Sequence, residues 1–275
     1  MVDAVLLIFR EVLEAALILS LLLALSNKLQ LNYRWSFLAL LVGVIGSWLL
    51  AHYAYEIADA MEGTGQELLN AALYCAAILS VIALGLLILP LAFRPGSARA
   101  AANNEELPLH HQRLLYGLFI IVVSFSLMRE GSEIWIYLSA FTQHPTAMSS
   151  ALIGAAIGTG IGMSLGAIIY YVFAFMREKY FLPIFLVVIT LLVGGFAMQI
   201  AKELMQIGLF DSTTPLWDSS FLVNEHSWLG ELLYALLGYD SRPSPIQGLF
   251  YLLAIAPILL ASLWHAWRLR ANTHA

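Results

Sequence analysis

A five-residue pattern, R-E-x-x-E, occurs twice in the chain, at residues 10–14 and 129–133. In an α-helix its two glutamates, three residues apart, point to one side, and the arginine lies four residues from the second glutamate. Each pattern therefore presents two carboxylates with one guanidinium beside them. Carboxylate oxygens suit hard cations, among them Fe(III), Mg²⁺, Ca²⁺ and Mn(II). The predicted ligands are Glu11, Glu14, Glu130 and Glu133, and the predicted charge partners are Arg10 and Arg129.

Both patterns lie within long apolar stretches. Of the 275 residues, 61% are hydrophobic and 11% are charged, and the mean hydropathy is +0.82. Soluble domains carry about 25% charged residues, so no soluble fold would bury this much apolar surface. A membrane-crossing helix needs about 20 apolar residues. The candidates are 4–26, 35–58, 68–92, 114–142, 149–176, 181–206 and 247–267. We therefore expect an all-α integral membrane protein with seven transmembrane helices.

Charged side chains at the centre of such helices are costly, at roughly 2.5–3.5 kcal/mol each. One explanation is an Arg–Glu pair that only holds helices together. That pairing leaves one glutamate over in each pattern, which gives an excess of two negative charges. The excess favours a functional role, an ion pathway, over a purely structural one.

Basic residues between the stretches predict the orientation. Lysine or arginine occurs in the first, third and fifth connections and in the C-terminal tail, whereas the other side has few. By the positive-inside rule the N-terminus is outside and the C-terminus is cytoplasmic. The basic residues are Lys28, Arg34, Arg94, Arg99, Arg113, Arg177, Lys179, Arg268 and Arg270.

The two patterns lie at comparable depth in oppositely directed helices. At 1.5 Å per residue, each is roughly 12–18 Å below the outer end of its helix. We therefore expect a single domain with an inverted repeat of two three-helix units and a site near the midplane. The first unit covers 1–92 and the second 114–207, followed by an outer loop at 208–245 and a seventh helix at 246–268. Within that loop, the amphipathic stretch 228–237 predicts an interfacial helix.

Other acidic residues lie near the predicted outer ends. Asp3 precedes the first pattern by two helical turns and is a candidate for an outer funnel. Glu56 and Asp59, with His52 one turn earlier, would share one helical face. They predict either an accessory cation site or a solvated helix end.

Small residues and the cysteine content add structural expectations. Gly154, Gly158, Gly162 and Gly166 form a smooth stripe on one helix, which predicts close packing against another helix. The single cysteine, Cys75, excludes a disulfide framework and argues against a thiolate metal site.

The sequence resembles the high-affinity iron permease family, the oxidase-dependent iron transporters of fungi and their bacterial counterparts. That family carries an R-E-x-x-E motif in its first and fourth helices. Glu62-Gly63 is similar to the family's acidic E-G element. The segments 217–219, 229–230, 238–239 and 243–244 are similar to the outer loop of bacterial members. The resemblance covers nearly the whole chain.

The resemblance implies an iron permease, not an enzyme, that moves Fe(III) or Fe(II) from outside into the cytoplasm through both patterns, with Glu62 contributing. It implies no permanently bound cofactor and a multi-pass location in a cell membrane, the bacterial inner membrane. Expected partners are the iron ion, membrane lipid and separate periplasmic or membrane proteins that deliver or oxidise iron. No nucleic-acid partner is expected, and a homo-oligomer is compatible with it.

Two other functions stay open at this point. One is an intramembrane metal-dependent enzyme, although neither a paired D-x-x-x-D motif nor an E-E-x-x-x-R element occurs at membrane depth, and no nucleophile accompanies the glutamates. The other is a permease for a different divalent cation such as Mn(II), because the ligand chemistry alone does not select iron.

Overall fold

All regular elements in the described part of the chain are α-helices. The structure, a computed structural model, describes residues 2–93, 109–142, 145–211, 214–224 and 227–273, and these ranges contain no β-strand. The helices are α1 (Val2–Lys28), α2 (Arg34–His52), α3 (Ala54–Ala60), α4 (Gly65–Ala92), α6 (Leu109–Ser139), α7 (Pro145–Phe175), α8 (Glu178–Gln206), α9 (Trp228–Leu237) and α10 (Pro245–Thr273). The expected all-α class is confirmed.

Six helices of the described chain are long and apolar enough to cross a membrane: α2, α4, α6, α7, α8 and α10. α1 has sufficient length, at 27 residues, but is more highly charged. Every 18-residue stretch of α1 contains Glu11 and Glu14 together with Arg10 or Lys28. The one expected span that is not among these six is therefore α1, which carries the first R-E-x-x-E pattern.

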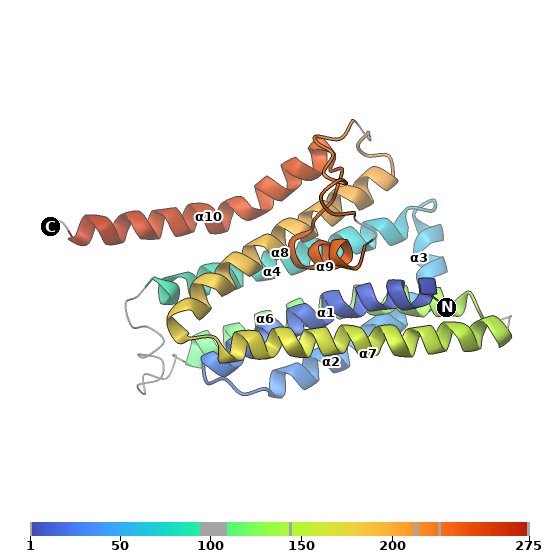
Figure 1. Ribbon diagram of the computed structural model, residues 1–275, viewed down its shortest axis with the longest axis horizontal. Coiled ribbons are helices and arrows are strands. Elements are labelled where there is room, and N and C mark those ends of the chain that lie inside the picture. The colour runs from blue at the N-terminus through green and yellow to red at the C-terminus, as the bar shows by residue number, and fades with distance from the viewer. Residues whose placement is uncertain (1, 94–108, 143–144, 212–213, 225–226, 274–275) are drawn as a thin grey trace.

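The predicted second span, 35–58, is wrong at its end. α2 stops at His52, and the backbone of Tyr53 leaves the helical conformation (φ −97°, ψ 12°) before α3 begins. The His52 ring stacks on Trp48 and meets Tyr53 edge-on. Figure 1 shows α3 running across the direction of α2 and the other long helices. Hydropathy averaged over the length of a span does not detect such a break, because the apolar residues at 37–51 dominate the average.

The other predicted spans differ mainly at their ends. The fourth, predicted at 114–142, is helix Leu109–Ser139, so the segment 109–113 is helical rather than part of a polar connection. The remaining predicted ranges lie within α1, α4, α7, α8 and α10 apart from one residue at 176.

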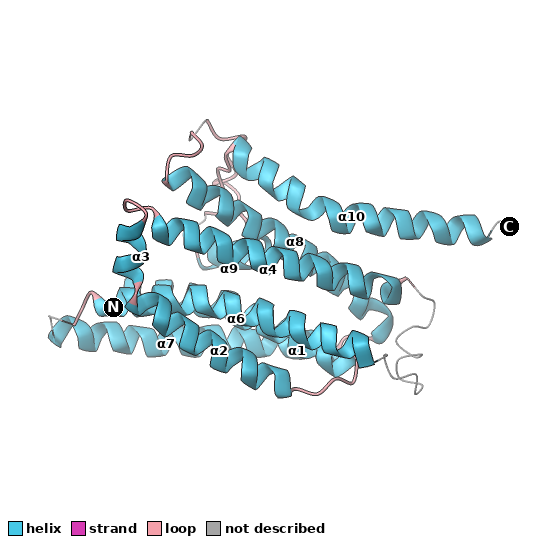
Figure 2. Ribbon diagram, turned by 180° about the vertical axis from the view of Figure 1, so that it is seen from behind, coloured by secondary structure: helices cyan, strands magenta, loops and turns pink. Residues whose placement is uncertain are grey.

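The helices form two layers, with α1, α2, α6 and α7 in one and α4, α8 and α10 in the other (Figure 1). The most extensive packing is between α1 and α7, followed by α2 with α6 and α4 with α8. Helix ends and connections gather at two opposite ends of the bundle (Figure 2). We call the end with residue 2, α3 and the loop after α8 the N-terminal end, and the other the opposite end.

The glycine stripe of α7 packs against α1, as expected. A Cβ added at Gly158 would lie 2.6 Å from the carbonyl oxygen of Val5, and one at Gly162 would lie 2.9 Å from a methyl carbon of Val12. A Cβ at Gly166 would meet Ala16 at 2.8 Å. The α1 backbone therefore rests directly on α7, which fixes the position of the charged residues on α1.

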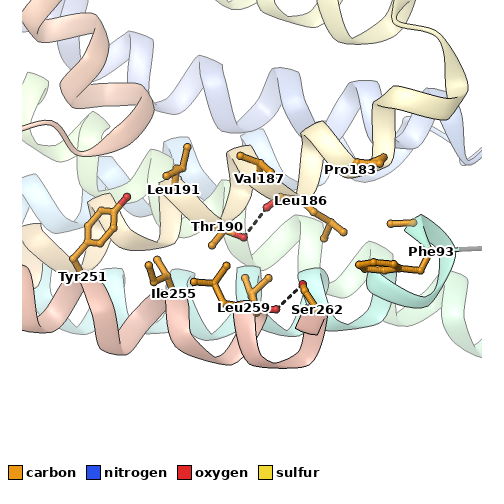
Figure 3. A pocket seen from close by; sticks show the side chains of 12 residues that line it. Phe93, Pro183, Leu186, Val187, Thr190, Leu191, Tyr251, Ile255, Leu259 and Ser262 are labelled. Atoms are coloured by element: carbon orange, nitrogen blue, oxygen red, sulfur yellow. Dashed lines mark hydrogen bonds between the residues drawn. The ribbon is translucent and has the colours of Figure 1, made fainter. Parts of the chain in front are cut away.

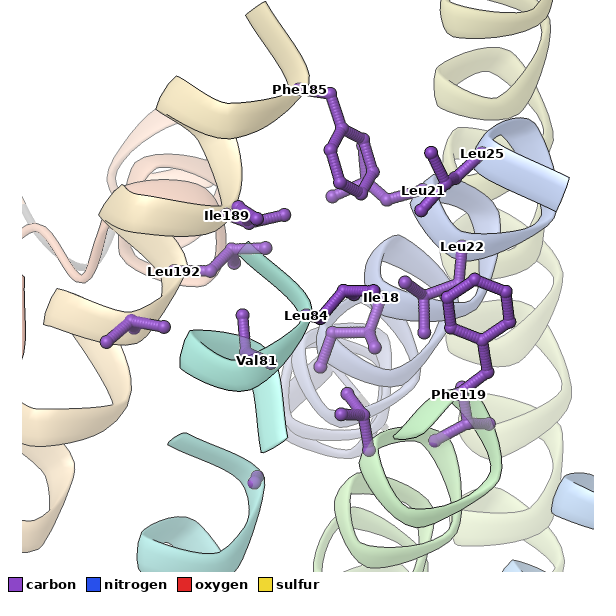
Figure 4. Close-up of a cluster of buried hydrophobic side chains, with 14 of the residues drawn as sticks. Ile18, Leu21, Leu22, Leu25, Val81, Leu84, Phe119, Phe185, Ile189 and Leu192 are labelled. Atoms are coloured by element: carbon purple, nitrogen blue, oxygen red, sulfur yellow. The ribbon is translucent and has the colours of Figure 1, made fainter. Parts of the chain in front are cut away.

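The half of the bundle toward the opposite end is filled by apolar side chains. Figure 4 shows leucines and isoleucines of α1, α4 and α8 in one buried cluster with Phe119 and Phe185. Leu21, Leu84, Phe119 and Phe185 are each at most 1% exposed. Among the described residues, these side chains form one closely packed apolar core in that half.

Candidate functional site

The two R-E-x-x-E patterns meet at the side chain of Arg129. Its Nη1 lies 2.6 Å from Oε2 of Glu130, and its Nη2 lies 2.8 Å from Oε1 of Glu133, both on the same helix, α6. The same Nη1 lies 3.7 Å from Oε2 of Glu14 and 3.9 Å from Oε2 of Glu11, both on α1. All four predicted ligands therefore surround one guanidinium group.

Arg10 occupies a different position from its counterpart. Its Nε lies 3.5 Å from Oε1 of Glu14, and its guanidinium lies over the ring of Tyr234 in α9, 4.0 Å from the centroid. The Arg10 side chain is 32% exposed, whereas that of Arg129 is 8% exposed. Two identical patterns thus place one arginine at the centre of the site and the other at its edge.

The carboxylates differ in their access to solvent. Glu11, Glu14 and Glu130 are buried, whereas the Glu133 side chain is 29% exposed. Buried charges are tolerated only where they are paired and hydrogen-bonded. Four ionised carboxylates against two arginines leave two negative charges in excess, so the net charge of the site favours binding of a further cation.

Several polar atoms around Arg129 lack a hydrogen-bond partner within the described ranges. They are Oε2 of Glu11, Nε of Arg129 and the hydroxyls of Tyr74 and Ser126. The Tyr74 ring, on α4, lies under the guanidinium, 4.6 Å from centroid to Cζ. Because nearly all buried polar groups in proteins have partners, such a group of unsatisfied atoms indicates a place for an ion or water.

A polar cavity of about 390 Å³ lies beside this cluster, on the side of the N-terminal end. It is bounded by the first turns of α4, the last turns of α8 and Tyr234 of α9. Its lining residues are Arg10, Gln66, Glu67, Asn70, Arg129, Glu133, Gln199, Lys202, Glu203, Gln206 and Tyr234. Arg129 and Glu133 belong to both the cluster and the cavity, so the cavity gives the cluster access to that end.

Sequence reasoning missed most of the cavity residues. Glu67, Asn70, Lys202 and Glu203 are not among the predicted ligands or accessory residues. One signal was available: polar residues recur at helical spacing at the start of α4 and at the end of α8. That these two faces oppose each other follows only from the packing of α4 against α8.

The other large cavities are apolar. One, of about 470 Å³, lies between α8 and α10 (Figure 3). Tyr251 also lines it, and its two aliphatic hydroxyls, on Thr190 and Ser262, donate to carbonyls of their own helices, those of Leu186 and Ile258. A second, of about 740 Å³, is bounded by apolar residues of α10 and the preceding loop. In the described part of the chain, the first cavity has no charged lining residue, and the charged residue of the second, Asp240, is paired with Lys202.

The predicted accessory residues lie away from the cluster. Asp3, Glu56, Asp59 and Glu62 are exposed, and none of them lines the polar cavity. The break at Tyr53 places His52 on α2, whereas Glu56 and Asp59 lie on α3. The expectation that these three residues share one helical face is therefore wrong. Glu62 lies in the turn between α3 and α4 with a left-handed backbone (φ 54°). Its role remains a prediction.

The cluster does not have the geometry of a completed metal site. Within the described ranges, no group of three or more His, Cys, Asp or Glu side chains is arranged to hold a metal ion. The physical reason is that the Arg129 guanidinium lies between the carboxylates, where a metal ion would be. In this arrangement the carboxylates bind the guanidinium of Arg129, and a metal ion could enter only if that guanidinium moved.

The predicted helix 228–237 is present as α9, which packs on α8 and α1. Nζ of Lys202 lies 3.1 Å from Oδ2 of Asp240, just after α9, and Gln247 donates to the same oxygen. Burial alone would raise the pKa of the Asp240 carboxyl, but the Lys202 ammonium and the hydrogen bonds lower it below its ordinary 3.8. The ion pair between Lys202 and Asp240 holds the segment after α9 beside the polar cavity, which Lys202 lines.

Acidification to pH 5 should leave α9 in place. A carboxyl with a lowered pKa stabilises the fold above its unfolded pKa of 3.8 and loses that contribution as the pH falls through its lower folded value. Hydrogen bonds from Ser220, then from Arg242, likewise lower the pKa of Asp218 in this loop to about 2. We expect hydrogen–deuterium exchange of α9, corrected for intrinsic rates, to be constant from pH 8 to 5.

Asp240→Asn should accelerate that exchange at every pH, because it removes the charge at all pH values. If the corrected exchange of α9 in the unsubstituted chain is faster at pH 5 than at pH 7, the expected independence of pH is contradicted.

The model of the iron permease FTR1 family matches residues 1–264 of the 275. No curated protein and no solved structure matches.

Proposed function

This chain belongs to the iron permease FTR1 family and is a multi-pass membrane transporter of iron, and we propose that the ion crosses through the carboxylate cluster of α1 and α6. The observation that carries this proposal is the convergence of Glu11, Glu14, Glu130 and Glu133 on one guanidinium. Carboxylate oxygens from two helices suit a hard cation, and the family supplies its identity as iron. Iron is the cargo here, and the proposal includes no permanently bound cofactor.

In the proposed mechanism Arg129 is a tethered substitute for the ion. While the site is empty, its guanidinium offsets the repulsion among the carboxylates. An arriving iron ion brings more charge into the same space, so the carboxylates exchange the guanidinium and the ion's water for direct contacts. When the ion leaves, Arg129 returns. A site that is re-neutralised in this way releases its ion more readily than four bare carboxylates would.

The proposed direction is from the N-terminal end toward the opposite end, which corresponds to entry into the cytoplasm. Lys28 is the last residue of α1, Arg113 lies in the first turns of α6, and Arg177 immediately precedes α8. These three helix ends lie at the opposite end (Figure 1). Arg94 and Arg99, also used in that prediction, lie outside the described residues. A concentration of basic residues at one end favours a cytoplasmic location for it.

The packing of the helices supports the proposed inverted repeat of 1–92 and 114–207. Under that repeat α1 corresponds to α6, α2 to α7 and α4 to α8. The two extensive pairs α1–α7 and α2–α6 are then equivalent. In both pairs glycines face the helix that carries the motif: α7 contacts α1 through Gly158, and α2 contacts α6 through Gly43, whose added Cβ would meet Leu127.

The asymmetry between polar and apolar halves supports a gated mechanism. The polar cavity reaches the cluster from the N-terminal end, while buried side chains such as Leu84 and Phe185 fill the other half. We infer a state open toward the outside and closed toward the cytoplasm, in which transport requires rearrangement around these side chains. Separate partner proteins would deliver or oxidise iron at the outer end.

Uptake into liposomes tests the proposed function. Purified protein should admit radiolabelled iron, supplied as Fe(II) or as Fe(III), and Glu14→Ala and Glu133→Ala should reduce the initial rate by about 100-fold or more, because each removes a ligand that the ion needs during passage. Glu178→Ala, on an exposed residue of α8 at the opposite end, is the matched control and should transport normally.

Undiminished uptake by both cluster variants would exclude the proposed pathway. Competition by unlabelled Mn(II) or Mg²⁺ in the same assay tests the identity of the cargo, and the two labelled forms compare its oxidation states.

A further inference from the structure

We propose that the polar cavity contains a second cation site, between the N-terminal end and the cluster. It is built by Glu67 and Asn70 of α4 with Gln199 and Glu203 of α8. It rests on the proposed function, because it places a first binding station on the same route. Its ligand is a hard, partly hydrated metal cation, the cargo on its way to the motif glutamates.

The first support is a set of polar side chains that face the cavity with incomplete hydrogen bonding. Gln199 lines the cavity and is only 9% exposed, and its amide makes no side-chain hydrogen bond within the described ranges. Oε2 of Glu67 is also buried and lacks a hydrogen-bond partner there. Asn70 donates to Oε1 of Glu203 at 3.4 Å, a long contact that joins α4 to α8. A bound ion would satisfy these oxygens together.

The second support is the charge balance. The cations that line the cavity already have acidic partners: Lys202 pairs with Asp240, Arg10 with Glu14, and Arg129 with the cluster. No lysine or arginine nitrogen in the described chain lies within 4.0 Å of a carboxylate oxygen of Glu67 or Glu203. Two carboxylates without an ion-pair partner in a half-buried cavity are costly unless a mobile cation compensates them.

The donor set indicates the kind of cation. Two carboxylates and two amide carbonyls are oxygen ligands of the type that hard cations select. The cavity volume of about 390 Å³ leaves space for water on the ion. A site with fewer carboxylates than the cluster binds more weakly, which is what a first station needs if the ion is to move on.

Glu133 connects the two sites. It is bonded to Arg129 at 2.8 Å, yet its side chain is 29% exposed and lines the cavity. An ion held by Glu67 and Glu203 could pass to Glu133 before it displaces the guanidinium. The two stations would then share a ligand and act in sequence.

Equilibrium binding of Fe(II) under anaerobic conditions, with Tb(III) as a soluble trivalent probe in a parallel series, separates the two sites. We expect about two ions per unsubstituted chain, as multi-site conduction requires, and about one in Glu67→Gln/Glu203→Gln and in Glu14→Gln/Glu130→Gln. Both double variants keep the side-chain shape. Size-exclusion profiles and thermal stability identify misfolded protein, and Asp211→Asn, an exposed residue at the same end, is the control.

Uptake by the same variants gives a second readout. Glu67→Gln/Glu203→Gln should raise the half-saturating iron concentration about tenfold or more, because the acidic cavity concentrates cations, while the maximal rate changes little. The cluster variant should lose uptake and keep the cavity ion. If Glu67→Gln/Glu203→Gln binds and transports like the unsubstituted chain, the second site is excluded and the proposed function stands. If only the cluster variant binds and transports normally, the proposed function fails instead.

Discussion

Arg129→Ala should abolish iron uptake and lower the free energy of unfolding by about 3–5 kcal/mol, the usual result of removing one partner from a buried ion pair. The reason is the number of carboxylates that depend on this side chain. Glu130 and Glu133 each bond to it at 2.6 and 2.8 Å, and Glu11 and Glu14 lie within 3.9 Å. Without the guanidinium, repulsion among the four would push α1 and α6 apart.

The same variant tests the role of a tethered substitute for the ion. If Arg129 only stabilises the fold, Arg129→Ala should lose iron binding together with its structure. If it competes with iron, the folded fraction should bind iron at least as tightly as the unsubstituted protein but fail to release it. Iron binding in detergent, normalised to the folded fraction by size exclusion, separates these outcomes.

Two further variants serve as controls. Arg129→Lys retains the charge, but an ammonium cannot present two parallel donors to Glu130 and Glu133, so we expect partial stability and slow uptake. Adding Glu130→Gln to Arg129→Ala removes one of the repelling charges and should recover part of the lost stability without recovering uptake. Normal uptake by Arg129→Ala would contradict the proposed mechanism.

The sequence could predict the cluster because its cost and its spacing both appear in the primary structure. Charged residues inside an apolar stretch are conspicuous, and helical periodicity specifies which of them share a face. The glycine stripe of α7 was predictable for a similar reason, since its small residues repeat every four positions. Each of these inferences can be made from the sequence of a single helix.

Features that depend on how several helices meet were not predictable. The identical patterns gave no reason to expect that Arg129 would lie among the glutamates while Arg10 turned toward Tyr234. That difference follows from α9, which belongs to a long loop whose path is set by tertiary contacts. The position of Glu203 in a polar cavity was not predictable, because the face of α4 opposite it cannot be identified from α8 alone.

Gly158→Leu should prevent assembly of the bundle and thereby abolish iron binding and uptake. Even a Cβ at this position would lie 2.6 Å from the carbonyl oxygen of Val5 and 2.9 Å from the amide nitrogen of Phe9. These are backbone atoms of α1, so they cannot move aside as a flexible side chain could. The only relief is separation of α7 from α1, which loses the close packing that holds membrane helices together.

Gly160→Leu is the matched control, because it lies on the same helix and a Cβ there would have no atom within 4 Å. It should leave the protein folded and active, so any loss specific to Gly158→Leu reflects the contact with α1. The monodisperse fraction by size exclusion and the midpoint of thermal unfolding measure the effect. The consequence for the site is direct: Glu11 and Glu14 follow the α7 contact by one to two helical turns. An α1 displaced there could no longer bring its carboxylates within reach of Arg129, and equal behaviour of the two leucine variants would show that α7 does not position them.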